Sequence, residues 1–301
     1  MPDPESYRIR GGAKRMIDVS ILENPKVDAA FAFHVWPEFE YGIIGLKDGI
    51  LTATSDIFRV NITGKGGHVA KPKSTNNPVL AVCDAIMQIK LIENSEPHIL
   101  DIVDVDVKAD AKNIIPTSGI FWGSIRTLSL ETRDLLEGEI LKILEDTKER
   151  YKVEYEIDFI HLDYLPVIND LNNTKHCENS ASKVAIVRRL INPYFIGEDF
   201  GWFSSSGIPS TLMLLGCSPI DRIGNNELHT DNMIVDERTL QLGIDIMTDV
   251  ALSYNLETNI NITSGTKYEI TDEAMQNTPS NTCNNSQAGD LELQEYMDID
   301  Y

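Results

Sequence analysis

Three histidines stand at places where a protein can carry out chemistry. His34 ends the hydrophobic segment FHVWP, and His229 lies in the polar segment ELHTDNM before the last apolar helical pattern. His68 follows two glycines in GKGGHVAKP, where the absence of side chains lets the backbone approach a ligand closely. An imidazole can bind a metal or transfer a proton near neutral pH. Taken singly, each is more often a structural histidine, and the two glycines could equally serve a tight turn.

Other polar side chains could hold a small substrate. Asn113 lies in NIIP and Arg126 in IRT, and the planar guanidinium of Arg126 matches a carboxylate in shape. A surface ion pair is the simpler use of that arginine. Glu198 and Asp199 in GEDF are adjacent carboxylates near a predicted helix start, where helix capping is the simpler explanation.

The segment from 56 to 163 contains a complete pattern of secondary structure. Alternation of apolar and polar residues predicts strands over 57–63, 102–108, 120–126 and 153–159. Asn77, followed by proline, and Ser129 predict the N-caps of two amphipathic helices between these strands. The resulting order, βαββαβ, predicts a ferredoxin-like domain.

The same patterns predict which side chains of this domain face its core. In residues 102–108 the valines are expected on one face and the aspartates on the other. The helix after Ser129 is expected to bury the apolar face Leu135, Leu136, Ile140, Ile143 and Leu144.

The segments on either side resemble α/β material. Helices are predicted over 11–22, 176–191 and 235–254, and strands over 29–36, 42–54 and 210–217. We therefore expect a discontinuous α/β domain, residues 1–55 and 164–255, into which the domain 56–163 is inserted. Residues 256–301 are acidic and rich in Asn, Ser and Thr, so this tail is expected to be disordered.

Composition limits the classes of partner. The chain has 47 Asp and Glu against 26 Lys and Arg, a formal net charge of −21, which argues against nucleic acid or an anionic membrane as partner. No secretory signal or run of about 18 apolar residues is present, so we expect a cytoplasmic protein. The 4 cysteines show no CxxC spacing and are expected to be free thiols.

Seven motifs in order resemble one family. They are GGAKRMI, FHVWP, GKGGHVAKP, NIIPTSG, GSIRTLS, GEDF and LHTDNM. This run, which spans residues 11 to 254, resembles the metallopeptidase-related amidohydrolases: hippurate hydrolases, aminoacylases and plant indole-acetyl-amino-acid hydrolases. The resemblance implies a metallopeptidase-like α/β catalytic domain that binds two divalent metals. It also implies that the inserted domain is a lid that mediates dimerisation.

The resemblance further implies roles for single residues. His34 and His229 would be metal ligands, and His68 would reach from the lid, often toward the partner subunit's site, to stabilise an oxyanion. Asn113 and Arg126 would hold the substrate, with Arg126 on its free carboxylate. The metals, which could be Zn, Mn, Co or Ni, would activate water for hydrolysis of an N-acyl amino acid.

This sequence departs from the family pattern before His34. A Cys-Gly-His-Asp-x-His type segment, which supplies two ligands, is absent, and the family's Glu-Glu pair is replaced by Pro-Glu-Ser around Glu5. Glu5 could stand for the catalytic base or for a metal ligand. The catalytic domain is thus expected to be partial, with its N-terminal part missing.

Three functions therefore remain open. The chain could be an amidohydrolase whose N-terminal part is missing from the gene model or is supplied by another chain. It could be a non-catalytic homologue that forms a homodimer or heterodimer through residues 56–163 and acts in regulation. It could also bind a carboxylate ligand through Asn113 and Arg126 without chemistry.

Overall fold

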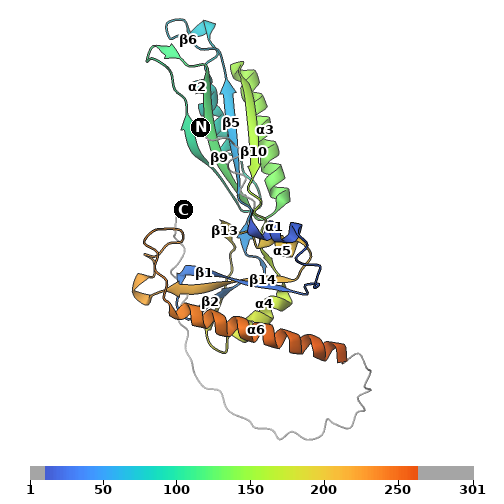
Figure 1. The fold of residues 1–301 in the computed structure, drawn as a ribbon. Helices are drawn as coiled ribbons and strands as arrows, with labels where there is room; N and C mark the ends of the chain where they lie inside the picture. Colours follow the sequence, from blue (N-terminus) through green and yellow to red (C-terminus); the bar gives the residue numbers. More distant parts are fainter. Residues whose placement is uncertain (1–10, 264–301) are drawn as a thin grey trace, which may run out of the picture. The chain divides into compact units, whose positions relative to one another are not determined.

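The computed structural model describes residues 11–263, with side-chain surroundings up to residue 254. The described residues up to Leu256 belong to one compact unit, the first of the chain. The first unit has a mixed α/β fold with two four-stranded sheets (Figure 1). The last helix runs to Thr263, beyond its predicted end at 254. The rest of the predicted tail lies outside the described residues.

One sheet combines parallel and antiparallel strands. Its order is β1-β14-β2-β12, from β1 (Ala30–Glu40), β14 (Ser210–Ser218), β2 (Ile43–Leu46) and β12 (Ile186–Arg189). β1 and β14 are parallel, with Ala30 opposite Ser210, whereas β14 and β2 are antiparallel. Every residue of β14 is buried, as the uninterrupted apolar run predicts for a strand covered on both faces.

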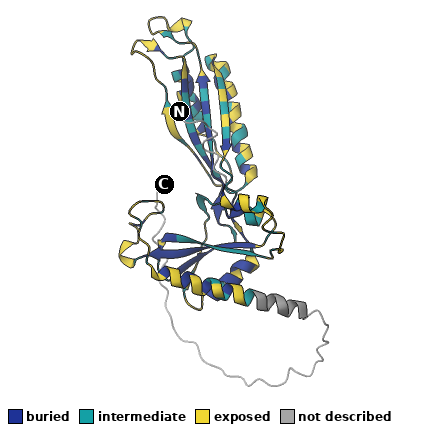
Figure 2. Cartoon of the chain, in the orientation of Figure 1, coloured by how far each residue is buried: buried dark blue, intermediate teal, exposed yellow. Residues whose placement is uncertain are grey.

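Helices cover one face of this mixed sheet. The apolar faces of α4 (Leu171–Ala181) and α6 (Arg238–Thr263) pack on β2 and β14, with Cys177, Ile246 and Val250 buried between them (Figures 1 and 2). The opposite face has a separate core, formed by Trp36, Phe39, Ile43, Leu51, Val167, Phe200, Leu212 and Leu214.

The second sheet is antiparallel throughout. Its order is β10-β5-β9-β7, from β10 (Glu154–His161), β5 (Asp56–Thr63), β9 (Ser118–Thr127) and β7 (His98–Asp106). α2 (Pro78–Ile89) and α3 (Leu130–Tyr151) pack on one face of it, so the chain order is βαββαβ (Figure 1). Both predicted N-caps are present: Asn77 Oδ1 accepts the N–H of Val79 at 3.0 Å, and Ser129 Oγ accepts that of Thr132 at 3.1 Å. We call this segment, residues 56–161, the antiparallel unit.

Short elements connect these parts. They are α1 (Gly12–Asp18), β3 (Gly49–Ile50), β4 (Thr52–Ala53), β6 (Gly67–His68), a 3₁₀ helix (Pro72–Ser74), β8 (Ile114–Ile115), β11 (Ile168–Asn169), β13 (Tyr194–Gly197), α5 (Gly201–Ser205) and a second 3₁₀ helix (Ile220–Arg222).

Three expectations were wrong in detail. The helix predicted over 176–191 ends at Ala181, and Ile186–Arg189 forms strand β12 because these residues pair with β2. A bulge between Ile102 and Asp104 shifts the register of β7, so Val103 is 64% exposed instead of facing the core. On α3, Leu135 is 62% exposed, because the buried stripe is centred on Leu136, Ile140 and Leu144.

Candidate functional site

His34 is half-buried in β1, an edge strand of the mixed sheet. Its Nδ1 lies 2.7 Å from the carbonyl oxygen of Val35, to which it donates a hydrogen bond. That bond fixes the proton on Nδ1 and leaves the lone pair of Nε2 free for a ligand, the usual arrangement of a metal-binding imidazole. The indole of Trp36 packs edge-on against the ring at 5.8 Å, which further restricts its orientation.

The GEDF segment lies beside His34 and holds the start of α1. Asp199 Oδ2 accepts the N–H of Ala13 at 2.9 Å, and a Cβ at Gly11 would lie only 2.7 Å from the Cβ of Asp199. Capping is therefore confirmed, but the capped helix is α1 rather than the helix that follows Asp199. Burial raises the pKa of Glu198, and the neighbouring His34 acts in the opposite direction. Glu198 is thus within electrostatic reach of His34.

Two buried polar side chains connect the loop of His229 to the strand of His34. Ser218 Oγ, at the end of β14, donates to the carbonyl of Pro37, and Asn226 Nδ2 donates to Ser218 Oγ at 2.6 Å. Asn226 also closes the loop on itself, since its Oδ1 accepts the N–H of Ile234 at 2.8 Å. His229 lies exposed in this loop, with a left-handed φ of 61°.

The sequence did not single out Ser218 or Asn226. Ser218 ends an apolar strand and Asn226 lies in a polar loop, where serine and asparagine are ordinary, so only their burial and their hydrogen bonds reveal what they do.

His68 and Asn113 lie together, as neighbouring parts of the antiparallel unit. β6 pairs with β8, and the N–H of Val69 donates to the Asn113 carbonyl at 3.0 Å. The N–H of Ala70 donates to His68 Nδ1 at 3.1 Å, so in the neutral ring the proton resides on Nε2. The exposed His68 therefore presents Nε2–H as a hydrogen-bond donor.

Arg126 lies in β9, near the end of that strand that is farther from the His68 loop. The His68 loop adjoins the start of β9, since the N–H of Gly64 donates to the Thr117 carbonyl at 2.8 Å, whereas Arg126 is one residue from the end of β9. At a rise of about 3.3 Å per residue, the strand from Ser118 to Arg126 extends about 26 Å. Within one chain, His68 and Arg126 therefore cannot touch one small substrate together. Glu5 lies outside the described residues.

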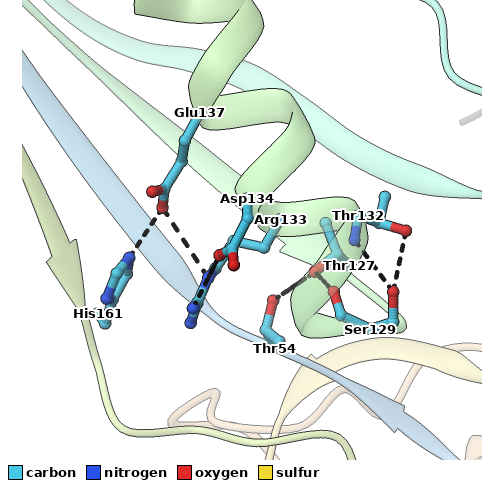
Figure 3. A network of polar contacts seen from close by, with 8 residues as sticks. All are labelled: Thr54, Thr127, Ser129, Thr132, Arg133, Asp134, Glu137 and His161. Carbon is cyan, nitrogen blue, oxygen red and sulfur yellow. Dashed lines mark hydrogen bonds and ion pairs between the residues drawn. The ribbon is translucent and has the colours of Figure 1, made fainter.

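We call the described residues outside the antiparallel unit, 11–55 and 162–263, the mixed-sheet part. A polar network surrounds the place where the antiparallel unit joins it (Figure 3). The N–H of Thr54 donates to the carbonyl of Thr127 at 2.7 Å, and the two hydroxyl oxygens lie 3.0 Å apart. His161 Nε2 contacts Glu137 Oε1 at 2.8 Å, a bond that raises the pKa of His161. These contacts hold the last residue of β10 to α3 and the end of β9 to the segment before β5.

Asp56 completes this junction. It is opposite His161 in the β5–β10 ladder, and its Oδ2 is buried with no hydrogen-bond partner among the described residues. Burial raises the pKa of Asp56, while Arg133 and His161 act against that rise. Burial also lowers the pKa of Arg126, and Asp56 opposes that change.

A metal site needs several His, Cys, Asp or Glu side chains close together. Within residues 11–263, no group of three or more His, Cys, Asp or Glu side chains is placed to hold a metal ion. A catalytic zinc site normally has three protein ligands. His34 suits a metal ligand by its free Nε2, but the described part of the chain does not supply a full set of ligands.

The described cysteines form no disulfide bond with one another. Cys83, Cys177 and Cys217 are free thiols, as expected, and burial raises the pKa of Cys177 to about 12. Over the described part of the chain, no helix is long and apolar enough to cross a membrane.

Known proteins share this pattern over most of the chain. The model of peptidase family M20/M25/M40 matches residues 1–253. An N-acetyldiaminopimelate deacetylase of Pediococcus pentosaceus is 30% identical over 251 residues, which are 81% of this chain and 63% of that protein. An IAA-amino acid hydrolase of Arabidopsis thaliana is 27% identical over 82% of this chain and 58% of its own length. The chain thus spans less than two thirds of these relatives.

Solved structures show the same fold. The YXEP protein of Bacillus subtilis, described as a dinuclear metal binding peptidase, superposes with a TM-score of 0.67 at 22% identity, over 81% of this chain and 61% of its own. Aminopeptidase PepT of Bacillus cereus gives a TM-score of 0.60 at 17% identity, over 78% and 61% of the two chains.

Proposed function

Since this chain belongs to peptidase family M20/M25/M40, we propose that it acts in metal-dependent hydrolysis of the amide bond of N-acyl amino acids or related amides. One observation supports this most directly: Ser218 and Asn226 connect the loop of His229 to the strand that carries His34. Relatives whose names describe a deacetylase and an amino acid hydrolase support the same reaction type.

Each proposed role follows from the chemistry of the side chain. His34 and His229 are metal ligands, and Glu5 is either a further ligand or the general base. A bound divalent metal supplies an activated water. The Nε2–H of His68 donates to the oxyanion that forms on the acyl carbon, while Arg126 holds the substrate's carboxylate and Asn113 a further polar group.

The antiparallel unit is proposed to be a ferredoxin-like lid that also forms a dimer, as residues 56–163 were expected to do. The separation of about 26 Å between the ends of β9 supports this, because His68 and Asn113 then serve a site in a second copy. β7 is one of the two edge strands of the sheet and exposes Val103 and Val105, while α2 exposes Met87 and the turn after it exposes Leu91. Apolar side chains on an unpaired edge favour association.

Hydrolysis is tested with the full chain. The purified protein is supplied in turn with Zn, Mn, Co and Ni, and amino acid release from N-acetyl amino acids is measured. We expect metal-dependent release that His34→Ala abolishes and that the control His98→Gln, a half-exposed histidine on β7, leaves within about twofold. Absence of release with every metal, or release that His34→Ala does not change, would overturn the proposal.

Dimerisation is tested by light scattering. Val103→Lys combined with Met87→Lys should convert a dimer into a monomer, because two charges would be buried in the contact. Leu252→Lys on α6, a residue 65% exposed, is the matched control and should leave the dimer intact. A wild-type monomer at micromolar concentration would contradict the proposed contact.

A second function has one observation in its favour. Because the described residues hold no three-donor metal group, a homologue that dimerises or binds a carboxylate without catalysis also agrees with the structure. Metal content after dialysis decides between the two functions. Stoichiometric metal with turnover supports the enzyme, and a metal-free, inactive dimer supports the non-catalytic homologue.

A further inference from the structure

The loop that carries His68 differs in charge from the rest of the chain. No Asp or Glu occurs between Asp56 and Asp84, although the chain as a whole has a formal net charge of −21. Within that stretch, residues 64–76 contain Lys65, Lys71 and Lys73 around His68. We call residues 64–76 the basic tip.

The lysines of the basic tip are exposed and have no anionic partner among the described residues. Some exposed lysines elsewhere pair with a carboxylate, such as Lys142 with Glu139 at 2.6 Å and Lys148 with Glu154 at 2.8 Å, whereas within the described chain none of the three in the basic tip does. Ammonium groups on one short loop repel one another, and an acidic protein offers many neighbours that could neutralise them. Their isolation indicates a place for an anion that the chain itself does not supply.

The backbone of the basic tip is held firmly, so its lysines extend from a fixed base. Lys65 and Asn76 exchange two backbone hydrogen bonds, at 3.0 and 2.9 Å, and the hydroxyl of Thr75 donates to the Pro72 carbonyl at 2.8 Å. A Cβ at Gly64 would lie 2.2 Å from the Asn76 carbonyl oxygen, and one at Gly66 2.5 Å from that of Ile115. Such packing admits only glycine and reduces the entropy lost on binding.

We propose that the basic tip binds a second carboxylate of the substrate, so that dianionic N-acyl amino acids are preferred. The inference rests on the proposed function, in which His68 reaches the substrate and therefore brings Lys65, Lys71 and Lys73 near the substrate's remaining groups. Arg126 already binds one carboxylate in that scheme, which leaves the lysines for another. The adjoining loop, residues 107–113, contains one acid, Asp110, and two further lysines, Lys108 and Lys112, so it adds no net negative charge.

The test compares isosteric substrates that differ in one charge. We expect kcat/KM for N-acetylglutamate to exceed that for N-acetylglutamine by about tenfold, equivalent to about 1.4 kcal/mol, and the ratio to shrink as salt rises. N-succinyl-leucine against its terminal amide, N-succinamoyl-leucine, reports whether the second carboxylate is recognised on the acyl side. The double variant Lys71→Gln with Lys73→Gln, the tip variant, should reduce the ratio of the two kcat/KM values to within about twofold. The control Lys142→Gln with Lys148→Gln on α3 should preserve that ratio. Equal rates for both pairs, or a ratio unchanged by the tip variant, would overturn the inference.

A binding measurement separates this inference from the proposed function. Glutarate, added to the ¹⁵N-labelled full chain, should shift the amide resonances of residues 64–76 more than its monoamide does, and the tip variant should lose that difference. If hydrolysis fails but glutarate shifts these resonances, the proposed function falls and the anion site stands. If hydrolysis proceeds and neither charge preference nor shift is seen, the anion site falls alone.

Discussion

The antiparallel unit and the mixed-sheet part bury different kinds of side chain. The core of the antiparallel unit is apolar between its two helices and its sheet, and its buried polar residues lie mainly at the junction around Asp56 and Thr127. The mixed-sheet part buries polar residues throughout, including Asn169, Ser218 and Asn226. Asn169 and Ser218 bond to backbone groups of distant segments, and Asn226 bonds to Ser218 and to the backbone of its own loop. The fold of the antiparallel unit is therefore specified mainly by alternating apolar residues. The fold of the mixed-sheet part is specified also by individual buried hydrogen bonds.

The largest effect is expected from the apolar core. Phe121→Ala removes a fully buried ring that packs edge-on against Phe58 at 6.3 Å, and should lower the free energy of unfolding by about 3–5 kcal/mol. Chemical denaturation measures the change. Leu135→Ala, at a residue 62% exposed on the same unit, is the control and should cost less than about 1 kcal/mol. A similar cost for both would contradict the assigned core.

A smaller loss is expected from a single polar residue of the mixed-sheet part. Asn169 donates to the carbonyls of Lys47 and Leu212, at 2.8 and 3.0 Å, and accepts the N–H of Leu212 at 2.8 Å. Asn169→Ala leaves these buried groups without partners, and we expect a loss of about 2–4 kcal/mol in unfolding free energy. Asn172→Ala, at an exposed position of α4, should change it by less than about 0.5 kcal/mol. If Asn169→Ala were equally mild, hydrogen bonds would not distinguish the two parts.

A gain in unfolding free energy is expected from replacing a glycine inside a helix of the antiparallel unit. Gly138 lies inside α3, and a Cβ there would meet no atom within 4 Å. Gly138→Ala should therefore raise the unfolding free energy by about 0.5–1 kcal/mol, through lower entropy of the unfolded chain. Thermal unfolding of the variant should show the higher midpoint. A lower midpoint would mean that the helix surface at this position is in contact with something else.

The smallest effect concerns pH at the junction between the two parts. The hydrogen bond to Glu137 raises the pKa of His161 above its unfolded value of about 6.5, so protonated His161 stabilises the fold. That contribution is fully present below about pH 6.5 and is lost as pH rises through the raised folded pKa. Because the ring is 42% exposed, we expect less than about 1 kcal/mol. His161→Gln should thus destabilise at pH 5.5 and have almost no effect at pH 9, and a loss that grew with pH would contradict this sign.

The sequence predicts the antiparallel unit almost completely, because short-range alternation and the caps at Asn77 and Ser129 are local signals. It fails at Val103, where a bulge in β7 depends on pairing with β9. In the mixed-sheet part it predicts β14 from its apolar run, but it takes Ile186–Arg189 for helix, since only the contact with β2 makes those residues a strand.

The candidate site divides in the same way. His34, His68, Asn113, Arg126 and His229 are visible in the sequence because each lies in a motif. Ser218 and Asn226 are not visible, because what matters about them is a pair of hydrogen bonds that ends on the carbonyl of Pro37, far away in the sequence. The distance between His68 and Arg126 likewise follows from the length of β9 and from no local pattern.

The parallel pairing of β1 with β14 also sets an order of assembly during synthesis. Ala30 needs Ser210 as its neighbour, so at about 5–20 residues per second β1 waits about 10–40 seconds on the ribosome for its partner. All strands of the antiparallel unit are made within that interval and can pair at once. Phe31 and Phe33 meanwhile remain without their sheet, and we expect this stretch to be where a chaperone binds the nascent chain.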